Sequence, residues 1–462
     1  MFIGREQELK TLNDRYNSGR FEFLPIYGRR RVGKTALIKE FIKDKRSIFF
    51  TATESGENQN LRGLSAAIVE TVSGVVADIS YSGFESAFKV VYEYAKREKL
   101  VFVIDEYPYL AESCTAISSV LQVFIDHKLK ETDLFIILCG SSMSFMEYQV
   151  LGYKSPLYGR RTGQLKIEPF GFEGSSRFFD RVSKEDQAIA YGITGGIPKY
   201  LEMLDHECSL KDNIVNSFLR ADAMLFEEPS NLLKQELREP QTYNDILTAI
   251  ANGASKMNEI VTKANITGFD SSRCNKYLTS LISLGIVKKE HPAFAARSKK
   301  SIYRIKDGMF RFWYRFVQQN VTKIHLGLGE DVFKQIEPQI SAYMGEVFED
   351  ICIQWLWKEY AKGNLPVHFQ DCGRWWGTNP QTKTEQEIDI LAVDPTGSKA
   401  IFCECKWTNE KVGVNVLDSL LAKSDAFGYE EKYYMFFSKS GYTDAVAAKA
   451  NSRIHLVEFK DM

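Results

Sequence analysis

An eight-residue segment near the N-terminus has the residue types and the spacing that hold a nucleoside triphosphate. The segment "GRRRVGKT" (28–35) fits the pattern G-x-x-x-x-G-K-[ST]. Its two glycines let the backbone wrap phosphate oxygens, and the helix expected after it supplies oriented N–H groups. Lys34 should reach the β- and γ-phosphates, and the Thr35 hydroxyl should ligate Mg²⁺. We therefore expect ATP and Mg²⁺ as cofactors, with a binding loop made of Gly28, Arg29, Arg30, Arg31, Val32, Gly33, Lys34, Thr35 and Ala36.

A pair of acids further along the chain fits the same chemistry. In "LVFVIDEYPYL" (100–110) an apolar run leads into Asp105 and Glu106. This places both carboxylates at the carboxyl end of a buried strand, beside the phosphate crevice. Asp105 would hold Mg²⁺ through water, and Glu106 would polarise the attacking water. A GTPase is disfavoured because the N-K-x-D guanine motif is absent.

A second candidate centre lies in "EIDILAVDPTGSKAIFCECKW" (387–407). Alternate residues of a strand share a face, so Glu404 and Lys406 should point the same way, and Asp389 can join them from a paired strand. Two converging carboxylates are costly unless a divalent cation or protons compensate. With an adjacent lysine to orient or deprotonate a water, the group is typical of metal-dependent phosphodiester cleavage. The same residues also fit a structural ion cluster or a DNA-binding remnant.

The elements that must position these residues predict three domains. Residues 20–205 alternate helical patterns with apolar strand runs at 21–28, 47–53, 99–107 and 133–142, which predicts a parallel sheet covered on both faces. Residues from about 206 to 325 show helical periodicity ending in a basic hairpin, which is typical of a winged helix–turn–helix. The remainder reads as a helix, two strands, a helix (413–427) and a strand, a small α/β domain with a mixed sheet. The expected boundaries are 1–205, 206–325 and 326–462.

The middle segment is locally basic. Residues 241–317 contain 13 Lys or Arg and 5 Asp or Glu, in a chain of net charge -1. This favours duplex DNA as a partner. The recognition helix should start near Ser271, and the residues expected on DNA are Arg273, Asn275 and Lys276 from the helix and Arg297, Lys299 and Lys300 from the wing. A solvated face or a contact with an acidic domain is the alternative, and the aromatic run 309–317 reads as a buried connector.

Composition bounds the remaining possibilities. The chain has 462 residues, of which 44% are hydrophobic and 26% charged, as in soluble globular proteins. Eight cysteines without a disulfide framework predict a reduced, intracellular protein. The N-terminus lacks the apolar core of a signal peptide, and no apolar run is long enough to span a membrane. We expect a cytoplasmic protein with no membrane partner.

The N-terminal motifs together resemble a known family. The boxes "FIGREQEL", "GRRRVGKT", "VIDEYPYL", "LCGSS" and "GGIPKYL" look like the archaeal-type ATPases of the STAND branch of AAA+ proteins, over roughly residues 1–205. The resemblance implies a P-loop ATPase fold with a small helical lid. It also implies that Ile3, Gly4 and Arg5 lie near the adenine, that Ser141 senses the γ-phosphate, and that Pro198 packs against the base.

The segment "PLYGRRTGQLKIEPF" (156–170) also looks like this family. By that resemblance Arg160 or Arg161 could act as an arginine finger or a phosphate sensor, in cis or from a neighbouring subunit. A homo-oligomer is therefore left open. The alternative is a pair of solvated arginines beside a strand.

The C-terminal centre resembles a nuclease superfamily. The order D-(x)14-E-x-K is similar to PD-(D/E)xK nucleases, without the usual proline before the first acid. More narrowly, "GEVFED", "GRWW", "EIDILAV" and "CECKW" look like DUF234, the domain joined to these ATPases, which implies a restriction-endonuclease-like α/β fold. In that pattern Glu349 is a further metal-side acid beside Asp389 and Glu404, and Lys406 is catalytic.

Fold alone does not give activity. We expect an ATPase that engages double-stranded DNA and cleaves it with a metal-dependent nuclease-like domain. The alternative is a nucleotide-dependent regulatory switch whose C-terminal domain binds DNA or a protein partner without cutting.

Overall fold

The computed structural model describes residues 2–76, 79–266, 268–294, 300–379 and 383–462. Arg297 and Lys299 of the expected wing lie outside these residues. The chain divides into two compact units, which are described separately. The first comprises Met1–Pro169 with Ile197–Lys199, and the second comprises Phe170–Gly196 with Tyr200–Met462.

The first unit is built on a five-stranded parallel sheet of order β2-β3-β4-β1-β5. Four of its strands are the apolar runs expected from the sequence, and β5 is an addition. The central strands β1, β3 and β4 are buried along their whole length, which explains their continuous apolar sequences. The bounds are β1 Glu22–Tyr27, β2 Ser47–Thr51, β3 Val101–Asp105, β4 Phe135–Gly140 and β5 Leu165–Lys166.

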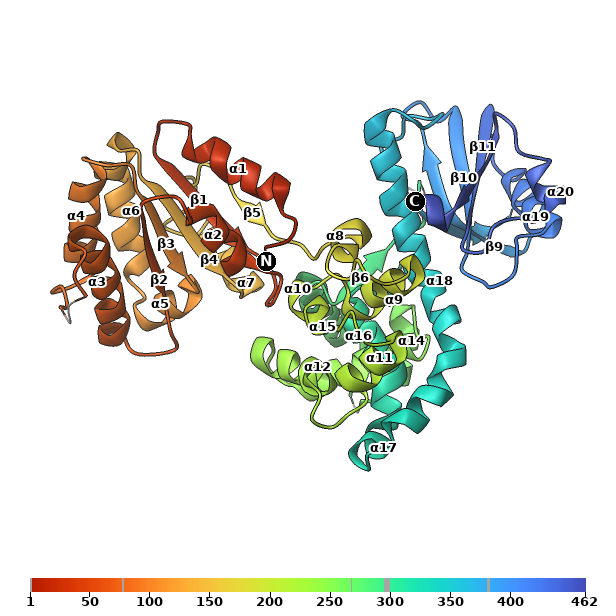
Figure 1. Ribbon diagram of the computed structural model, residues 1–462, viewed down its shortest axis with the longest axis horizontal. Helices are drawn as coiled ribbons and strands as arrows, with labels where there is room; N and C mark the ends of the chain where they lie inside the picture. The colour runs from red at the N-terminus through yellow and green to blue at the C-terminus, as the bar shows by residue number, and fades with distance from the viewer. Residues whose placement is uncertain (1, 77–78, 267, 295–299, 380–382) are drawn as a thin grey trace. The chain divides into compact units, whose positions relative to one another are not determined.

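Helices cover both faces of this sheet (Figure 1). On one face Phe88 of α4 packs edge-on against Phe102 of β3, with ring centroids 6.0 Å apart. On the other, Phe41 of α2 meets Phe135 of β4 at 5.7 Å. The helices are α1 Glu6–Tyr16, α2 Lys34–Ile42, α3 Glu57–Ser73, α4 Phe84–Ala95, α5 Tyr107–Ser113, α6 Ile117–His127 and α7 Met143–Phe145, with short turns η1 Leu129–Glu131 and η2 Met146–Val150.

The second unit begins with helices and is organised around the 34-residue helix α18, Gly329–Lys362. The Tyr343 hydroxyl of α18 donates to the carbonyls of Gly192 (2.6 Å) and Gly308 (3.1 Å), which ties α9 and α16 to it. Residues 170–196, assigned by sequence to the first domain, therefore pack within the second unit. The helices are α8 Phe172–Ser176, α9 Lys184–Thr194, α11 Leu210–Phe218, α12 Met224–Glu236, α16 Gly308–Phe312 and α17 Val321–His325, with turns η3 Trp313–Val317 and η4 Gln318–Asn320. The short helix α10 Pro198–Leu201 begins in the first unit and ends in the second.

Three helices and a hairpin follow in the order expected for the middle segment. They are α13 Pro240–Ala251, α14 Met257–Ala264 and α15 Ser271–Ser283, then the antiparallel strands β6 Val287–Glu290 and β7 Ile302–Ile305. Helix α15 starts at Ser271 because the Asp270 side chain accepts the Arg273 N–H at 2.7 Å as an N-cap. The aromatic run 309–317 is buried apart from its two arginines, which confirms the burial expected from the sequence.

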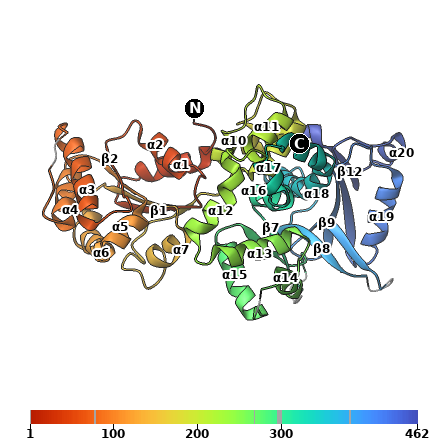
Figure 2. The same cartoon turned by 90° about the horizontal axis from the view of Figure 1, so that it is seen from below.

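The unit ends in a mixed five-stranded sheet of order β12-β11-β10-β9-β8 (Figures 1 and 2). The pairs β10–β11 and β11–β12 are parallel, and β9–β10 and β8–β9 are antiparallel. The elements are β8 Asp371–Thr378, β9 Glu385–Val393, β10 Lys399–Lys406, α19 Val414–Ser424, β11 Glu431–Ser438, α20 Asp444–Ala447, β12 Ile454–Glu458 and η5 Phe459–Asp461. Among the described helices of both units, none is long and apolar enough to cross a membrane.

Candidate functional site

The loop between β1 and α2 curves through two glycines and a left-handed arginine. A Cβ on Gly28 would lie 2.3 Å from the carbonyl oxygen of Ile167, so this position must be glycine. Arg31 (φ 71°) and Gly33 (φ 89°) both adopt left-handed conformations, which cost free energy at the arginine. Strain of this kind collects at ligand-binding loops. The structure therefore holds the loop in a fixed curved shape.

Lys34 is buried and reaches back across this loop. Its Nζ donates to the carbonyl oxygens of Gly28 at 2.8 Å and Arg29 at 3.0 Å. Only 5% of the lysine is exposed, so its charge is held inside the curve of the loop. A buried ammonium there favours an anionic ligand, because little water screens it.

Thr35 and Asp105 come together from the start of α2 and the end of β3. The Thr35 hydroxyl donates to the Asp105 carboxylate at 2.9 Å, and the N–H of Glu106 donates to its other oxygen at 3.1 Å. Asp105 is 3% exposed. A hydroxyl and a carboxylate oxygen in contact are the donor types that Mg²⁺ takes, so these residues fit the expected cation.

Glu106 is held by the residue expected to sense phosphate. Its backbone is left-handed (φ 50°), and its Oε2 accepts from the Ser141 hydroxyl at 2.9 Å and from the Ser141 N–H at 3.4 Å. Ser141 follows β4, the neighbour of the strand that ends at Asp105. The sequence predicts separate roles for Glu106 and Ser141 but not their direct contact. That they follow two neighbouring strands could have indicated this contact.

The residues expected around the adenine lie beside the loop. The Arg5 guanidinium donates to the carbonyls of Val32 at 3.1 Å and Glu168 at 2.8 Å, and the preceding Gly4 has φ 71°. Ile3 is half-buried. Pro198 Cγ lies 3.8 Å from where a Cβ on Gly33 would stand. The structure thus gathers the N-terminal box and Pro198 at the phosphate loop.

The two candidate arginine fingers have other partners within the first unit. Arg160 donates from two nitrogens to one oxygen of Asp126, at 2.9 and 2.6 Å, and this hydrogen bonding lowers the pKa of Asp126. Arg161 donates to the Leu151 carbonyl at 3.1 Å. Asp126 carried no signal in the sequence that would mark it as the partner of an arginine.

At the second candidate centre the strands β9 and β10 separate where the carboxylates stand. Their antiparallel register ends at the pair Cys403 and Ile390. Just beyond it the Cys405 N–H donates to the Asp389 carboxylate at 2.8 Å. Against β8 the register shifts, because Gly373 pairs with Leu391 whereas Trp375 pairs with Ile388. Asp389 therefore lies in a β-bulge, a device that re-aims side chains next to functional sites.

Glu404 stands beside this bulge with two lysines on its carboxylate. Lys406 Nζ donates to one oxygen at 2.6 Å and Lys423 Nζ to the other at 3.4 Å. Burial, and then the charge of Glu404, raise the pKa of Asp389. Burial alone would lower the pKa of Lys406, but the hydrogen bond and charge of Glu404 raise it. The structure thus brings Asp389, Glu404 and Lys406 together, and it adds Lys423, which the sequence analysis missed.

Glu349 of α18 has a different neighbour. Arg374 of β8 lies 3.9 Å from its carboxylate and also pairs with Glu387. Burial raises the pKa of Glu349 to about 7, with Arg374 opposing the shift and Asp389 adding to it. Throughout the described ranges, no group of three or more His, Cys, Asp or Glu side chains is arranged to hold a metal ion. The structure therefore does not gather Glu349, Asp389 and Glu404 into one cluster, and a cation here would fit Asp389 and Glu404.

Part of the basic charge of the middle segment is used inside the second unit. Arg304 and Arg311 lie 3.5 and 3.2 Å from the Glu346 carboxylate, and Lys288 lies 3.5 Å from Asp350. These partners belong to α18, so three of the 13 basic residues contact an acidic helix. Arg273, Asn275 and Lys276 are exposed on α15, whereas Cys274, Leu278 and Leu281 face inward.

Two segments of the chain match known protein families. Residues 2–204 match a family described as an ATPase domain predominantly from Archaea, and residues 313–417 match DUF234, described as "Archaea bacterial proteins of unknown function". The chain is 33% identical over 466 residues to the uncharacterized protein MJECL04 of Methanocaldococcus jannaschii, covering 100% of both. It also resembles the solved Walker-type ATPase PABY2304 of Pyrococcus abyssi, with a TM-score of 0.53, 20% identity and coverage of 68% of this chain and 96% of that one. The last likeness shows a shared fold.

Proposed function

Because the chain belongs to the family of archaeal-type ATPases with a C-terminal DUF234 domain, we propose that it uses Mg²⁺ and ATP to act on nucleic acid. In this proposal residues 1–205 form a STAND-type AAA+ ATPase with a helical lid, 206–325 contain a winged helix, and 326–462 form the nuclease-like domain. ATP would bias the arrangement of these domains through different affinities for their alternative states.

The roles in the nucleotide site follow from its contacts. Lys34 would exchange its loop carbonyls for phosphate oxygens, and Glu106, positioned by Ser141, would orient the attacking water. Mg²⁺, held by Thr35 and Asp105, would neutralise charge on the β- and γ-phosphates when bound.

The test of this site is Lys34→Ala, with Lys43→Ala as control because Lys43 is an exposed lysine just past the same helix. Binding of a fluorescent ATP analogue should be lost in the first variant and kept in the second. Normal affinity in Lys34→Ala would rule the assignment out.

Duplex binding is proposed for the exposed side of α15. Cys274, Leu278 and Leu281 bury one side of this helix and leave Arg273 and Lys276 exposed on the other, which supports phosphate contacts. Replacing Lys276 by alanine should weaken binding to all duplex sequences alike and reduce the salt slope by about 1. Binding that does not change with salt would contradict this role.

The observation that carries the cleavage proposal is the pairing of β9 with β10, which brings Asp389 next to Glu404 and Lys406. Repulsion between the two carboxylates is what a divalent cation would relieve, and Lys406 stands where it can hold a water or a phosphate oxygen. The three charged side chains lie on strands that also contribute Ile388, Leu391 and Phe402 to an apolar core cluster.

The experiment incubates the protein with plasmid and linear DNA, Mg²⁺ or Mn²⁺, and with or without ATP. Asp389→Ala should lose cleavage. Asp418→Ala, which removes an exposed acid of α19, should keep it. Equal degradation by the wild type and Asp389→Ala would mean that another centre, or a contaminant, cuts the DNA.

The basic residues around the C-terminal carboxylates support a second candidate function, a switch that does not cleave DNA. Lys406 and Lys423 contact both oxygens of Glu404, and Arg374 lies beside Glu349, so the charges are largely balanced without a metal. This favours a nucleotide-dependent switch that binds DNA or a protein partner without cutting it. ATP-dependent DNA binding with no cleavage under any metal would select this function.

A further inference from the structure

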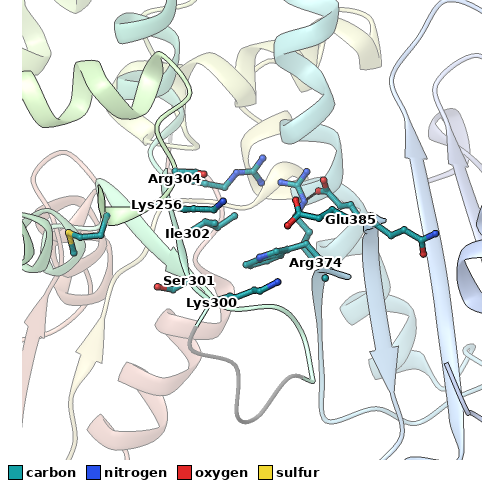
Figure 3. A pocket seen from close by; sticks show the side chains of 13 residues that line it. Lys256, Lys300, Ser301, Ile302, Arg304, Arg374 and Glu385 are labelled. Carbon is teal, nitrogen blue, oxygen red and sulfur yellow. Dashed lines mark ion pairs between the residues drawn. The ribbon is translucent and has the colours of Figure 1, made fainter. Parts of the chain in front are cut away.

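A cavity of about 660 Å³ opens in the second unit beside the candidate carboxylates (Figure 3). It is lined by the start of α14, by the strand β7 and the residues before it, and by β8 and β9. The lining includes Lys256, Lys300, Arg304, Arg374 and Trp376. A volume of this size holds a ligand of nucleotide dimensions.

The lining combines cations with one large aromatic ring. Figure 3 shows the basic side chains Lys256, Lys300, Arg304 and Arg374 around the cavity. They outnumber its two acids, Glu385 and Glu387. Both arginines are ion-paired, Arg304 with Glu346 and Arg374 with Glu387, and Lys256 Nζ lies 3.8 Å from the Glu259 carboxylate. The N–H groups of Ser255 and Lys256, which precede α14, both donate to Glu259. An anion in the cavity would be met by the side chains of Lys256 and Lys300.

The indole of Trp376 faces the cavity because of its place on β8. Its neighbour Trp375 packs into the core, with its ring 4.7 Å from that of Phe427. Successive residues of a strand point to opposite faces, so Trp376 lines the cavity. An aromatic ring beside cations is the combination that binds unpaired bases and their phosphates.

A neighbouring cavity, which Asp389 lines, shares part of its wall with this one. A second cavity of about 420 Å³ shares Arg304, Arg374 and Trp376 with the first, and its other lining residues include Glu349 and Asp389. A ligand longer than one nucleotide would thus reach from Trp376 to Asp389. In a duplex the bases are paired and stacked on one another, so Trp376 can stack only on a base that has left the duplex.

We propose that this cavity binds a single-stranded segment of nucleic acid, with a base on Trp376 and phosphates on Lys256 and Lys300. The substrate of the centre at Asp389 and Glu404 is then a single strand or a frayed end. The part concerning cleavage rests on the proposed function, whereas strand binding does not require it.

The test uses the full-length protein in EDTA, so that binding is measured without cleavage. The probes are an eight-nucleotide oligothymidylate, a blunt duplex of mixed sequence, and thymidine monophosphate. Binding is followed by anisotropy of labelled probes and by quenching of tryptophan fluorescence. The oligothymidylate should quench the wild type, and Trp376→Ala should weaken its binding about tenfold or more while leaving duplex binding unchanged.

Two control variants distinguish the loss of a stacking ring from a folding defect. Trp376→Phe keeps a stacking ring and should retain most of the affinity. Trp357→Ala removes an indole that is 38% exposed and packs on Phe369 rather than in the cavity, and it should bind normally. Lys300→Ala should reduce the salt dependence of oligothymidylate binding.

Three outcomes would overturn the proposal: unchanged strand binding in Trp376→Ala, equal weakening of strand and duplex binding, or binding of the monophosphate alone. The cleavage assay with Asp389→Ala distinguishes failure of the nuclease function from failure of strand binding at Trp376. Trp376-dependent strand binding without any cleavage would keep this site and remove the nuclease function.

Discussion

Replacing Glu349 by glutamine should stabilise the second unit at neutral and alkaline pH. The carboxyl group is 18% exposed, and its burial raises its pKa from an ordinary 4.5 to about 7. Each tenfold change in proton affinity corresponds to about 1.4 kcal/mol, so ionising this group in the folded chain costs about 3 kcal/mol more than in the unfolded chain.

The direction in which the unfolding free energy changes with pH follows from proton binding to Glu349. Between pH 4.5 and 7 the folded chain holds a proton on Glu349 that the unfolded chain has lost, so the free energy of unfolding falls as pH rises through this window. Glutamine has no such titration. The difference in unfolding free energy between Glu349→Gln and wild type should therefore grow by about 2.5 kcal/mol from pH 5 to pH 8.

Tryptophan fluorescence reports on the relevant part of the chain. All six tryptophans lie between residues 313 and 407, within the second unit. Urea titrations at pH 5, 6, 7 and 8, followed by this signal, give the unfolding free energy for each variant.

Glu346, one turn earlier on α18, provides a control of opposite sign. Burial would raise its pKa, but Arg311, Arg304 and Lys288 together lower it. Glu346→Gln should therefore destabilise the unit at pH 8. If the difference in unfolding free energy between Glu349→Gln and wild type stays the same from pH 5 to pH 8, burial does not raise the pKa of Glu349.

Two further predictions concern the nucleotide site. Gly28→Ala should lower ATP affinity about tenfold, because its Cβ would meet the Ile167 carbonyl, whereas Gly56→Ala, with open space around it, should bind normally in the same fluorescence titration. Glu106→Gln should keep ATP affinity and lower phosphate release by a factor of about 10²–10⁴, and hydrolysis at the wild-type rate would remove Glu106 from the mechanism.

The order of elements was readable from the sequence in most of the chain. The strands β1, β3 and β4 coincide with apolar runs, because strands buried on both faces need apolar residues at every position. In β2, which coincides with the run at 47–53, only alternate residues are buried. The hairpin of β9 and β10 followed from the turn at Pro395 and Gly397. The two-residue β5 was missed, since so short a strand has no periodicity to recognise.

The ion pairs could not be predicted from the sequence. Lys288, Arg304 and Arg311 looked like a basic surface for DNA, yet α18 brings acids to all three. Arg374 and Lys423 are distant in sequence from the acids that they contact, Glu349 and Glu404. Such contacts depend on how helices pack on the sheet, and no local pattern encodes them.

The phosphate loop could be identified from the sequence alone. Its function depends on eight consecutive residues whose backbone conformation is set by two glycines and the strand and helix on either side. Other contacts became visible only in the folded chain: Ser141 donates to Glu106, the Cys405 N–H donates to Asp389, and Arg374 lies beside Glu349. Those arrangements join residues separated by many positions in the chain, so they exist only once the sheets and α18 have packed.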